Sequence, residues 1–210
     1  MLNYSTYFPN IIAVSKTFPM DEIKPLIDHG HIHFGENKVQ ELIHKSSQLS
    51  PLINWHFIGH LQSNKVTALL KIDPYLIHSV HSLNLARKIS QTATALGIEA
   101  QILLQINSTR EPTKQGLSEN ELLHDMDEFL SLPSLSLEGL MTMGPMQGNE
   151  KELRTCFASL RQLRDTIQTE WKLEQFKHLS MGMSSDFHYA ILEGATLIRV
   201  GSHIFGPRMV

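Results

Sequence analysis

Features that define several protein classes are missing from this chain of 210 residues. It has one cysteine, Cys156, and therefore no intramolecular disulfide, which is typical of proteins in reducing compartments. Its apolar runs are all shorter than the ~18 residues that a membrane span requires. Met1 to Asn10 lacks the basic stretch and the apolar stretch of a secretory signal. We therefore expect a cytoplasmic protein with no membrane partner.

An excess of charge of one sign is also missing. Lys and Arg total 18 and Asp and Glu total 21, so the formal net charge is −3 and no broad basic surface is available for a nucleic-acid backbone. No tract rich in proline, glycine or serine divides the chain. Apolar residues make up 41% and charged residues 19%, which is ordinary for a globular protein. We predict a single domain over residues 1–210 and no nucleic-acid partner.

What the chain does contain is a regular alternation of short apolar runs and longer amphipathic segments. The runs with the length and composition of buried strands are Ile11–Ser15, Ile32–Phe34, Trp55–Ile58, Leu76–Val80, Ala100–Ile106, Leu135–Met141, His178–Met181 and Leu197–Gly201. Strands that alternate with helices predict a parallel α/β fold. Eight such units favour a single closed (β/α)8 barrel of the TIM type, although an open doubly wound sheet would show the same alternation.

Three of the intervening segments carry clear helix signals. The segment Ala86–Leu96 repeats apolar residues at helical spacing and stops before Gly97, a residue suited to a helix C-terminus. Ser118, with Glu121 three residues later, has the pattern of a capping box. The segment Leu153–Trp171 has one apolar face.

Two cationic residues lie in strands that a closed barrel would bring together. Lys16 follows the first predicted strand, at the end where barrel active sites are built. Arg199 lies between apolar residues of the last strand, and its guanidinium stays charged, so its burial requires an acceptor, commonly a core carboxylate. In a closed barrel the first and last strands are neighbours. The two cations would then face an anionic or electron-rich ligand.

Turns of small residues follow the last two strands. After the seventh strand, Ser184 and Ser185 offer hydroxyls, and a helix starting at Asp186 would favour an anion at its N-terminus. Gly201 and Ser202 form a second such turn, and the loops after strands seven and eight of barrels often hold phosphate. A phosphate clamp, a lysine and an arginine are together the parts of a pyridoxal phosphate site. The aldehyde needs an amine, the phosphate needs donors and the ring nitrogen needs a partner.

Ordered motifs extend this pattern over residues 11–208. They are Ala13-Val14-Ser15-Lys16-Thr17, Phe34-Gly35-Glu36-Asn37, Trp55-His56-Phe57-Ile58-Gly59-His60-Leu61-Gln62, Gly139-Leu140-Met141, Ser180-Met181-Gly182-Met183-Ser184 and Arg199-Val200-Gly201-Ser202-His203-Ile204-Phe205-Gly206. With these motifs the chain closely resembles the pyridoxal phosphate homeostasis proteins, the YggS/PROSC-type family. The resemblance implies the single-barrel fold of the alanine racemase N-terminal domain, fold type III of pyridoxal phosphate proteins. Family members usually carry a longer helix before the first strand, whereas ten residues precede Ile11 here, so the resemblance does not extend to a lid or helix contact from that segment.

The resemblance also implies which residues hold the cofactor. Lys16 would form a Schiff base with the aldehyde of pyridoxal 5'-phosphate. The other implied contacts are to the phosphate from Ser184, Ser185, Gly201 and Ser202, to the pyridine nitrogen from Arg199, and to the ring from Asn37 and Met141. His60 lies on a loop at the same mouth, where it is a candidate gate.

The implied function is a carrier that sequesters pyridoxal 5'-phosphate and delivers it to apo-enzymes, which maintains intracellular vitamin B6 and, indirectly, amino-acid homeostasis. A permanent cation beside the ring nitrogen disfavours protonation of that nitrogen and weakens the ring as an electron sink. Racemases also need a second base, which another domain or subunit supplies. We therefore expect a monomeric carrier without efficient catalysis.

Three other functions fit parts of the sequence. An active pyridoxal phosphate-dependent racemase or lyase would need a base such as Tyr189 or a histidine. A metal-dependent hydrolase would use the alternating His29, His31 and His33. Further histidines are His56, His60, His78 and His81. No Asp and His set stands at strand ends with ligand spacing, so we expect no metal. An interaction protein would use the arginines of the segment Leu153–Trp171, for which a solvated face is the simpler explanation.

Overall fold

The computed structural model describes residues 8–49, 52–108 and 115–207. These residues form strands β1 (Asn10–Val14), β2 (His33–Glu36), β3 (Asn54–Phe57), β4 (Leu76–Val80), β5 (Ala100–Gln105), β6 (Leu135–Met141), β7 (His178–Met183) and β8 (Leu197–Val200). They also form helices α1 (Met20–Asp28), α2 (Val39–Ser46), η1 (Ser63–Lys65), α3 (Val66–Leu70), α4 (Leu83–Leu96), α5 (Glu119–Ser131), α6 (Glu150–Trp171), α7 (Phe187–Leu192) and α8 (Ser202–Phe205). Within those three ranges, no helix is long and apolar enough to cross a membrane. The expectation about a short N-terminal segment concerns residues 1–7, which lie outside the described residues.

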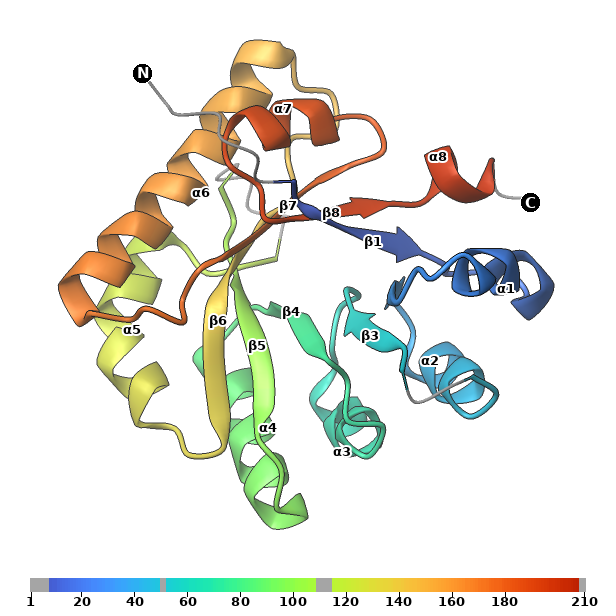
Figure 1. Ribbon diagram of the computed structural model, residues 1–210. Coiled ribbons are helices and arrows are strands. Elements are labelled where there is room, and N and C mark those ends of the chain that lie inside the picture. The colour runs from blue at the N-terminus through green and yellow to red at the C-terminus, as the bar shows by residue number, and fades with distance from the viewer. Residues whose placement is uncertain (1–7, 50–51, 109–114, 208–210) are drawn as a thin grey trace.

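The strands pair in chain order, all in parallel, to form a closed barrel with the helices around its outside (Figure 1). Closure depends on β1 and β8, which pair with Ile12 opposite Arg199. The predicted (β/α)8 barrel is therefore confirmed. The alternative of an open doubly wound sheet is wrong, because β1 has a hydrogen-bonded neighbour on each side.

The clearest shift of a strand boundary from the sequence expectation occurs at β2. The apolar run indicated residues 32–34, whereas the strand runs from His33 to Glu36. Sequence reasoning stopped short because a carboxylate is not expected inside a buried strand. Glu36 is fully buried, but Nζ of Lys45 on α2 lies 2.7 Å from its Oε1. The ion pair allows the strand to continue through this position.

The apolar side chains form two layers separated by the strands. The larger layer lies between the barrel and the helices and includes Phe34, Leu104 and Phe157. A smaller cluster inside the barrel consists of Ile12, Leu76, Leu103, Met141 and Leu197. Successive side chains of a strand point to opposite faces, which divides neighbouring residues between the two layers. The barrel interior also holds buried polar side chains, among them His56, His78 and Arg199.

The helix signals of the sequence are confirmed. Gly97 ends α4 in the left-handed conformation, with φ of 69°. Ser118 and Glu121 make both hydrogen bonds of the capping box at the start of α5. Cys156 of α6 is buried. Local sequence therefore decides where these helices begin and end, and it does so through groups that satisfy the terminal amides and carbonyls.

The arginines of α6 make contacts within the chain and do not simply face solvent. Nε of Arg154 lies 2.8 Å from Oε1 of Glu193, and Nη2 of Arg161 lies 3.4 Å from Oε2 of the same carboxylate. Arg164 donates from Nη1 to the carbonyl of Lys177 at 2.7 Å. Because Glu193 directly follows α7, these contacts tie α6 to α7 on the outside of the barrel.

Gly139 provides a test of the barrel packing. The pairing of β5 with β6 shifts between Leu137 and Gly139, and Gly139 has φ of 145°. A methyl group there would lie 2.1 Å from the carbonyl oxygen of His178 on β7. We expect Gly139→Ala to lower the free energy of unfolding by about 3 kcal/mol, measured by urea denaturation.

Gly30→Ala is the matched control for this variant. Gly30 also has positive φ, at 86°, but no atom lies within 4 Å of the added methyl group. Backbone strain alone should lower the free energy of unfolding of Gly30→Ala by about 1 kcal/mol. Equal losses in the two variants would contradict the steric explanation for Gly139.

Candidate functional site

A cavity of about 750 Å³ opens at the carboxyl end of the barrel. Every site residue expected from the sequence lines it: Lys16, Asn37, Met141, Ser184, Ser185, Arg199, Gly201 and Ser202. These residues come from five different strand ends, so only closure of the barrel brings them together. His60 lines the same cavity, and its ring packs against His81 at a centroid distance of 4.8 Å. Another hollow, of about 810 Å³, lies beside the start of α6 and contains none of the expected site residues.

Lys16 reaches the cavity from a short turn after β1. The amide of Phe18 donates to the carbonyl of Ser15 at 3.1 Å, which closes the turn around Lys16 and Thr17. Thr17 has φ of 70°, a left-handed conformation that is unusual for a β-branched residue. Pro19 then precedes the first residue of α1. The turn therefore holds the lysine half-buried at the rim of the barrel.

Arg199 projects from β8 into the barrel and is almost completely buried. Its Nη1 donates to Oγ of Ser180 at 2.7 Å, and its Nη2 donates to the carbonyl of Thr142 at 2.9 Å. Burial lowers the pKa of Arg199 to about 10, against the attraction of Asp186, so the guanidinium remains charged at neutral pH. Both acceptors are neutral, which differs from the core carboxylate that is the common partner of a buried arginine. Its positive charge therefore reaches the cavity without being cancelled in these two contacts.

A chain of histidines supports Arg199 from inside the barrel. Nδ1 of His33 lies 2.9 Å from Nε2 of His56, and Nδ1 of His56 lies 2.9 Å from Nε2 of His78. Nδ1 of His78 then contacts Oγ of Ser180 at 2.8 Å. Because both ring nitrogens of His56 and His78 are occupied, each neutral ring donates through one nitrogen and accepts through the other. The chain thus links β2, β3, β4 and β7 to the oxygen that accepts from Arg199.

These histidines are neutral in the folded protein. Burial lowers the pKa of His56 well below its usual value, and the neighbouring His33 lowers it further. Burial likewise lowers the pKa of His78, with additional repulsion from His56 and Arg199. A second positive charge beside the guanidinium is thereby avoided.

The histidines do not form the metal site that the rival hydrolase interpretation requires. Within the described ranges, no three His, Cys, Asp or Glu side chains are grouped so that they could hold a metal ion. His29 and His31 precede β2 and do not share a strand face with His33. Nδ1 of His29 contacts the carbonyl of Pro25 at 2.7 Å, and Nε2 of His31 contacts the carbonyl of His33 at 2.8 Å. One ring nitrogen of each of these two histidines is therefore engaged by the backbone.

The turns after β7 and β8 meet on one side of the cavity. The amide of Gly201 donates to Oγ of Ser184 at 3.2 Å, which joins the two turns directly. Gly182 has φ of 91°, and a methyl group there would lie 2.6 Å from Cβ of Ala190, so glycine permits the close return of α7. The helix begins at Phe187, one residue later than expected, with Asp186 as its N-cap. At six residues α7 is too short for a strong dipole, so the hydroxyls and amides of the turns are the groups here that could donate to an anion.

Asn37 and Met141 contribute opposite kinds of surface to the cavity. Met141, at the end of β6, is buried and belongs to the apolar cluster inside the barrel. Asn37 follows β2, and its Oδ1 is buried with no hydrogen-bond partner among the described residues. An unpaired buried carbonyl is costly, so this atom is suited to accept a hydrogen bond from a ligand.

Sequence reasoning missed several residues of the cavity wall. They are Gln105, Gln115, Met143, Met183 and His203, together with Val14, Ile58 and Gly59. Gln105 had a usable signal, because an amide at the carboxyl end of an apolar strand is placed as a site residue of a barrel would be. Its Nε2 donates to the carbonyl of Gln115 at 3.0 Å. Gln115 lies ten residues further along the loop between β5 and α5, and no motif in the sequence distinguishes it from the rest of that loop.

Ser180 tests the support of Arg199. Ser180→Ala removes the acceptor of one guanidinium bond and the partner of His78. We expect the free energy of unfolding in urea to fall by about 2 to 3 kcal/mol, because a buried charged donor loses its partner. The control Ser90→Ala removes a buried hydroxyl that donates to the carbonyl of Pro133, and it should lower the free energy of unfolding by about 1 kcal/mol. Equal losses of unfolding free energy in the two variants would mean that Ser180 stabilises the buried guanidinium no more than an ordinary buried hydroxyl would.

The histidine chain predicts loss of stability in weak acid. The unfolded chain binds protons at its histidines below about pH 6.5, whereas His56 and His78 stay neutral when folded, so the free energy of unfolding falls as the pH falls. Each such histidine contributes a slope of about 1.4 kcal/mol per pH unit between pH 6 and 5. Urea denaturation at several pH values in this range gives the slope of the unfolding free energy against pH, and His78→Gln should reduce that slope by about 1.4 kcal/mol per pH unit. The same substitution at the exposed His44 should leave it unchanged; an unaltered slope in His78→Gln would contradict the prediction.

Comparisons with known proteins identify the family. The chain matches the family model described as alanine racemase, N-terminal domain, over residues 6–209. It is 41% identical over 200 residues to the pyridoxal phosphate homeostasis protein of Aquifex aeolicus, covering 94% of this chain and 86% of that protein. The structure of PipY from Synechococcus elongatus with pyridoxal phosphate bound is 36% identical, with a TM-score of 0.88 over 94% of this chain and 92% of PipY. An alanine racemase of Clostridium difficile, 19% identical, shares the fold with a TM-score of 0.78 over 96% of this chain and 53% of the racemase. The chain therefore belongs to the family of pyridoxal phosphate homeostasis proteins, built on the barrel of the alanine racemase N-terminal domain.

Proposed function

We propose that this chain is a carrier of pyridoxal 5'-phosphate, which it holds as a Schiff base on Lys16 and delivers to apo-enzymes. The observation that carries the proposal is the single cavity in which a lysine, a buried guanidinium and two serine- and glycine-containing turns converge. The relatives named pyridoxal phosphate homeostasis proteins support the same function. We further propose that the chain acts as a monomer in the cytoplasm.

The donor set of the cavity fits this cofactor. An aldehyde requires an amine, and Lys16 lines the cavity. The hydroxyls of Ser184, Ser185 and Ser202 are clustered as donors for a phosphate group. Oδ1 of Asn37, which has no partner in the described part of the chain, needs a donor, and a ring hydroxyl would provide one. A cofactor of this class supplies a reactive aldehyde and a conjugated ring when bound.

Each residue then has a definite task. The amine of Lys16 would condense with the aldehyde that the bound cofactor supplies, with loss of one water molecule. The serine hydroxyls and Gly201 would hold the phosphate at the turns after β7 and β8, and Met141 would pack beside the ring. Arg199, fixed by Ser180 and Thr142, presents its cationic edge to the ring nitrogen. Because that charge is permanent, Arg199 keeps the nitrogen unprotonated.

This arrangement favours storage and delivery over turnover. An unprotonated ring nitrogen is a poor electron sink, which disfavours carbanion chemistry. Tyr189, the candidate second base of a racemase, packs with the apolar layer outside the barrel and does not line the cavity in the described part of the chain. Addition of water to the carbon–nitrogen bond would instead regenerate the amine of Lys16 and the aldehyde, which would release the cofactor intact.

The central test is covalent trapping. Pyridoxal 5'-phosphate added to the purified protein should produce a visible absorbance band, and borohydride should fix the added mass on the peptide that contains Lys16. Lys16→Ala should lose both signals, because it lacks the amine. The control Lys38→Ala removes an exposed lysine next to Asn37 and should retain both.

Three outcomes would count against the proposal in different ways. A protein that stays colourless after addition of the cofactor would overturn the proposed function. Mass on Lys38 or Lys65 would overturn the assignment of Lys16 while preserving the cofactor class. Sustained racemisation of an amino acid that depends on Lys16 would overturn the carrier function and favour an active enzyme.

A further inference from the structure

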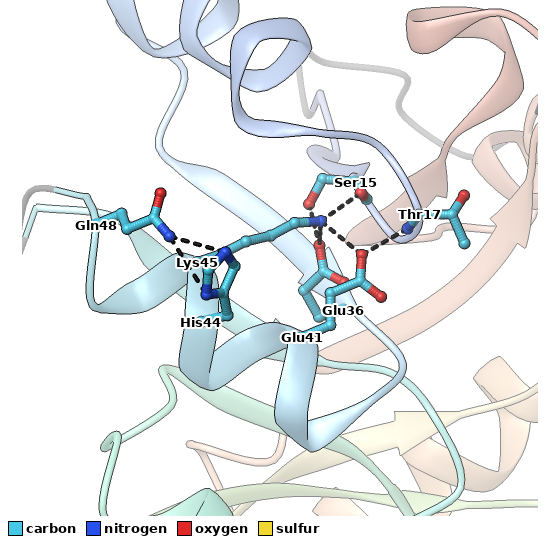
Figure 2. A network of polar contacts seen from close by, with 7 residues as sticks. All are labelled: Ser15, Thr17, Glu36, Glu41, His44, Lys45 and Gln48. Carbon is cyan, nitrogen blue, oxygen red and sulfur yellow. Dashed lines mark hydrogen bonds and ion pairs between the residues drawn. The ribbon is translucent and has the colours of Figure 1, made fainter.

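A buried ionic network lies behind the turn that carries Lys16, on the outer side of the barrel wall (Figure 2). Nζ of Lys45 donates to the carbonyl of Ser15 at 2.8 Å, to Oε1 of Glu36 at 2.7 Å and to Oε1 of Glu41 at 2.8 Å. The three bonds use all three protons of the ammonium group. Lys45 is only 4% exposed and Glu36 is fully buried, so the centre of the network is shielded from solvent.

The network contacts the backbone on both sides of Lys16. The carbonyl of Ser15, which accepts from Lys45, belongs to the peptide group that precedes Lys16. The amide of Thr17, which belongs to the peptide group that follows, donates to Oε1 of Glu41 at 2.6 Å. Oγ of Ser15 adds a bond to Oε1 of Glu36 at 2.6 Å. Both peptide groups that determine the direction of the Lys16 side chain are therefore held from one buried centre.

The strained turn explains why such support is needed. Thr17 adopts φ of 70°, which costs a non-glycine residue about 1 to 3 kcal/mol and persists only where the surroundings impose it. Glu41 supplies that constraint. Although partial burial acts to raise the pKa of Glu41, hydrogen bonds from Lys45 and Thr17 and the charge of Lys45 hold it below its ordinary value. The acceptor of the Thr17 amide is therefore ionised at neutral pH.

A purely stabilising role is the weaker explanation of this network. Buried ion pairs contribute little net stability, because desolvation opposes the attraction. Burial raises the pKa of Glu36, opposed by hydrogen bonds from Lys45 and Ser15, and its Oε2 is buried without a hydrogen-bond partner among the described residues. A network that served only to attach α2 to the barrel would not need to converge on the two peptide groups beside one lysine.

We propose that Glu36, Glu41 and Lys45 are positioning residues for Lys16, because they hold its two flanking peptide groups in the conformation that directs the amine into the cavity. The inference rests on the proposed Schiff-base function. It assigns to the turn Ser15–Phe18 a rigid geometry, set by α2, before any ligand arrives.

The test compares two substitutions of Glu41, whose side chain is 20% exposed. Glu41→Ala removes the acceptor of the Thr17 amide and keeps a strong helix former in α2. Glu41→Gln retains a carbonyl oxygen that can accept the same bond. The rate of Schiff-base formation, followed by absorbance after mixing with pyridoxal 5'-phosphate, should fall about 10-fold or more in Glu41→Ala and recover most of its value in Glu41→Gln.

A measurement without cofactor separates positioning from general stability. Amide hydrogen exchange of the peptide that contains Thr17 should accelerate in Glu41→Ala and return toward the original rate in Glu41→Gln. Glu193→Ala is the matched control, because it removes a 9% exposed carboxylate that bridges Arg154 and Arg161 far from the turn. It should lower the urea midpoint without slowing Schiff-base formation.

Two results would overturn the inference while leaving the proposed function intact. One is an unchanged rate of Schiff-base formation in Glu41→Ala. The other is an equal slowing in Glu41→Ala and Glu193→Ala, which would assign the effect to lost stability. If the unsubstituted protein forms no Schiff base, the proposed function fails and this inference fails with it.

Discussion

The parallel pairing of β1 with β8 is the constraint on which the rest of the molecule depends. It closes the sheet, and closure creates an interior that strands surround on every side between its two ends. The same pairing puts Ile12 opposite Arg199, so the strand that leads to Lys16 runs beside the strand that carries the guanidinium. Residues that are 183 positions apart in the chain, Lys16 and Arg199, thereby share one cavity.

A closed interior makes a buried cation expensive unless its hydrogen bonds are satisfied. The protein satisfies Arg199 with a serine hydroxyl and a backbone carbonyl, and it supports the hydroxyl with neutral histidines. A carboxylate in the same place would have neutralised the guanidinium. Neutral acceptors fix its orientation and leave its charge directed at the cavity.

Two separate polar systems therefore act on the cavity from opposite sides of the barrel wall. The histidine chain inside the barrel determines where Arg199 lies. The Lys45 network, between β2 and α2, holds the turn that carries Lys16. Neither system contributes a side chain to the cavity wall in the described part of the chain, apart from Arg199 itself. Both give rigid support to groups that must already be in place when a ligand binds, and such preorganisation reduces the ordering cost of binding.

Local physics alone made much of this protein predictable from its sequence. The apolar runs located the strands because buried strands require them, and the capping residues located α4 and α5. The site residues Lys16 and Arg199 and the two serine turns were recognisable because the strand ends of a barrel meet at one face. Only the tertiary structure decided four other features. They are the closure of the barrel, the neutral partners of Arg199, the hydrogen bonds that join the histidines to Ser180, and the hydrogen bonds of Lys45 behind the Lys16 turn. Each depends on a contact between residues far apart in the chain, such as His78 with Ser180, and no periodicity or spacing encodes which of many buried polar groups will become each other's partner.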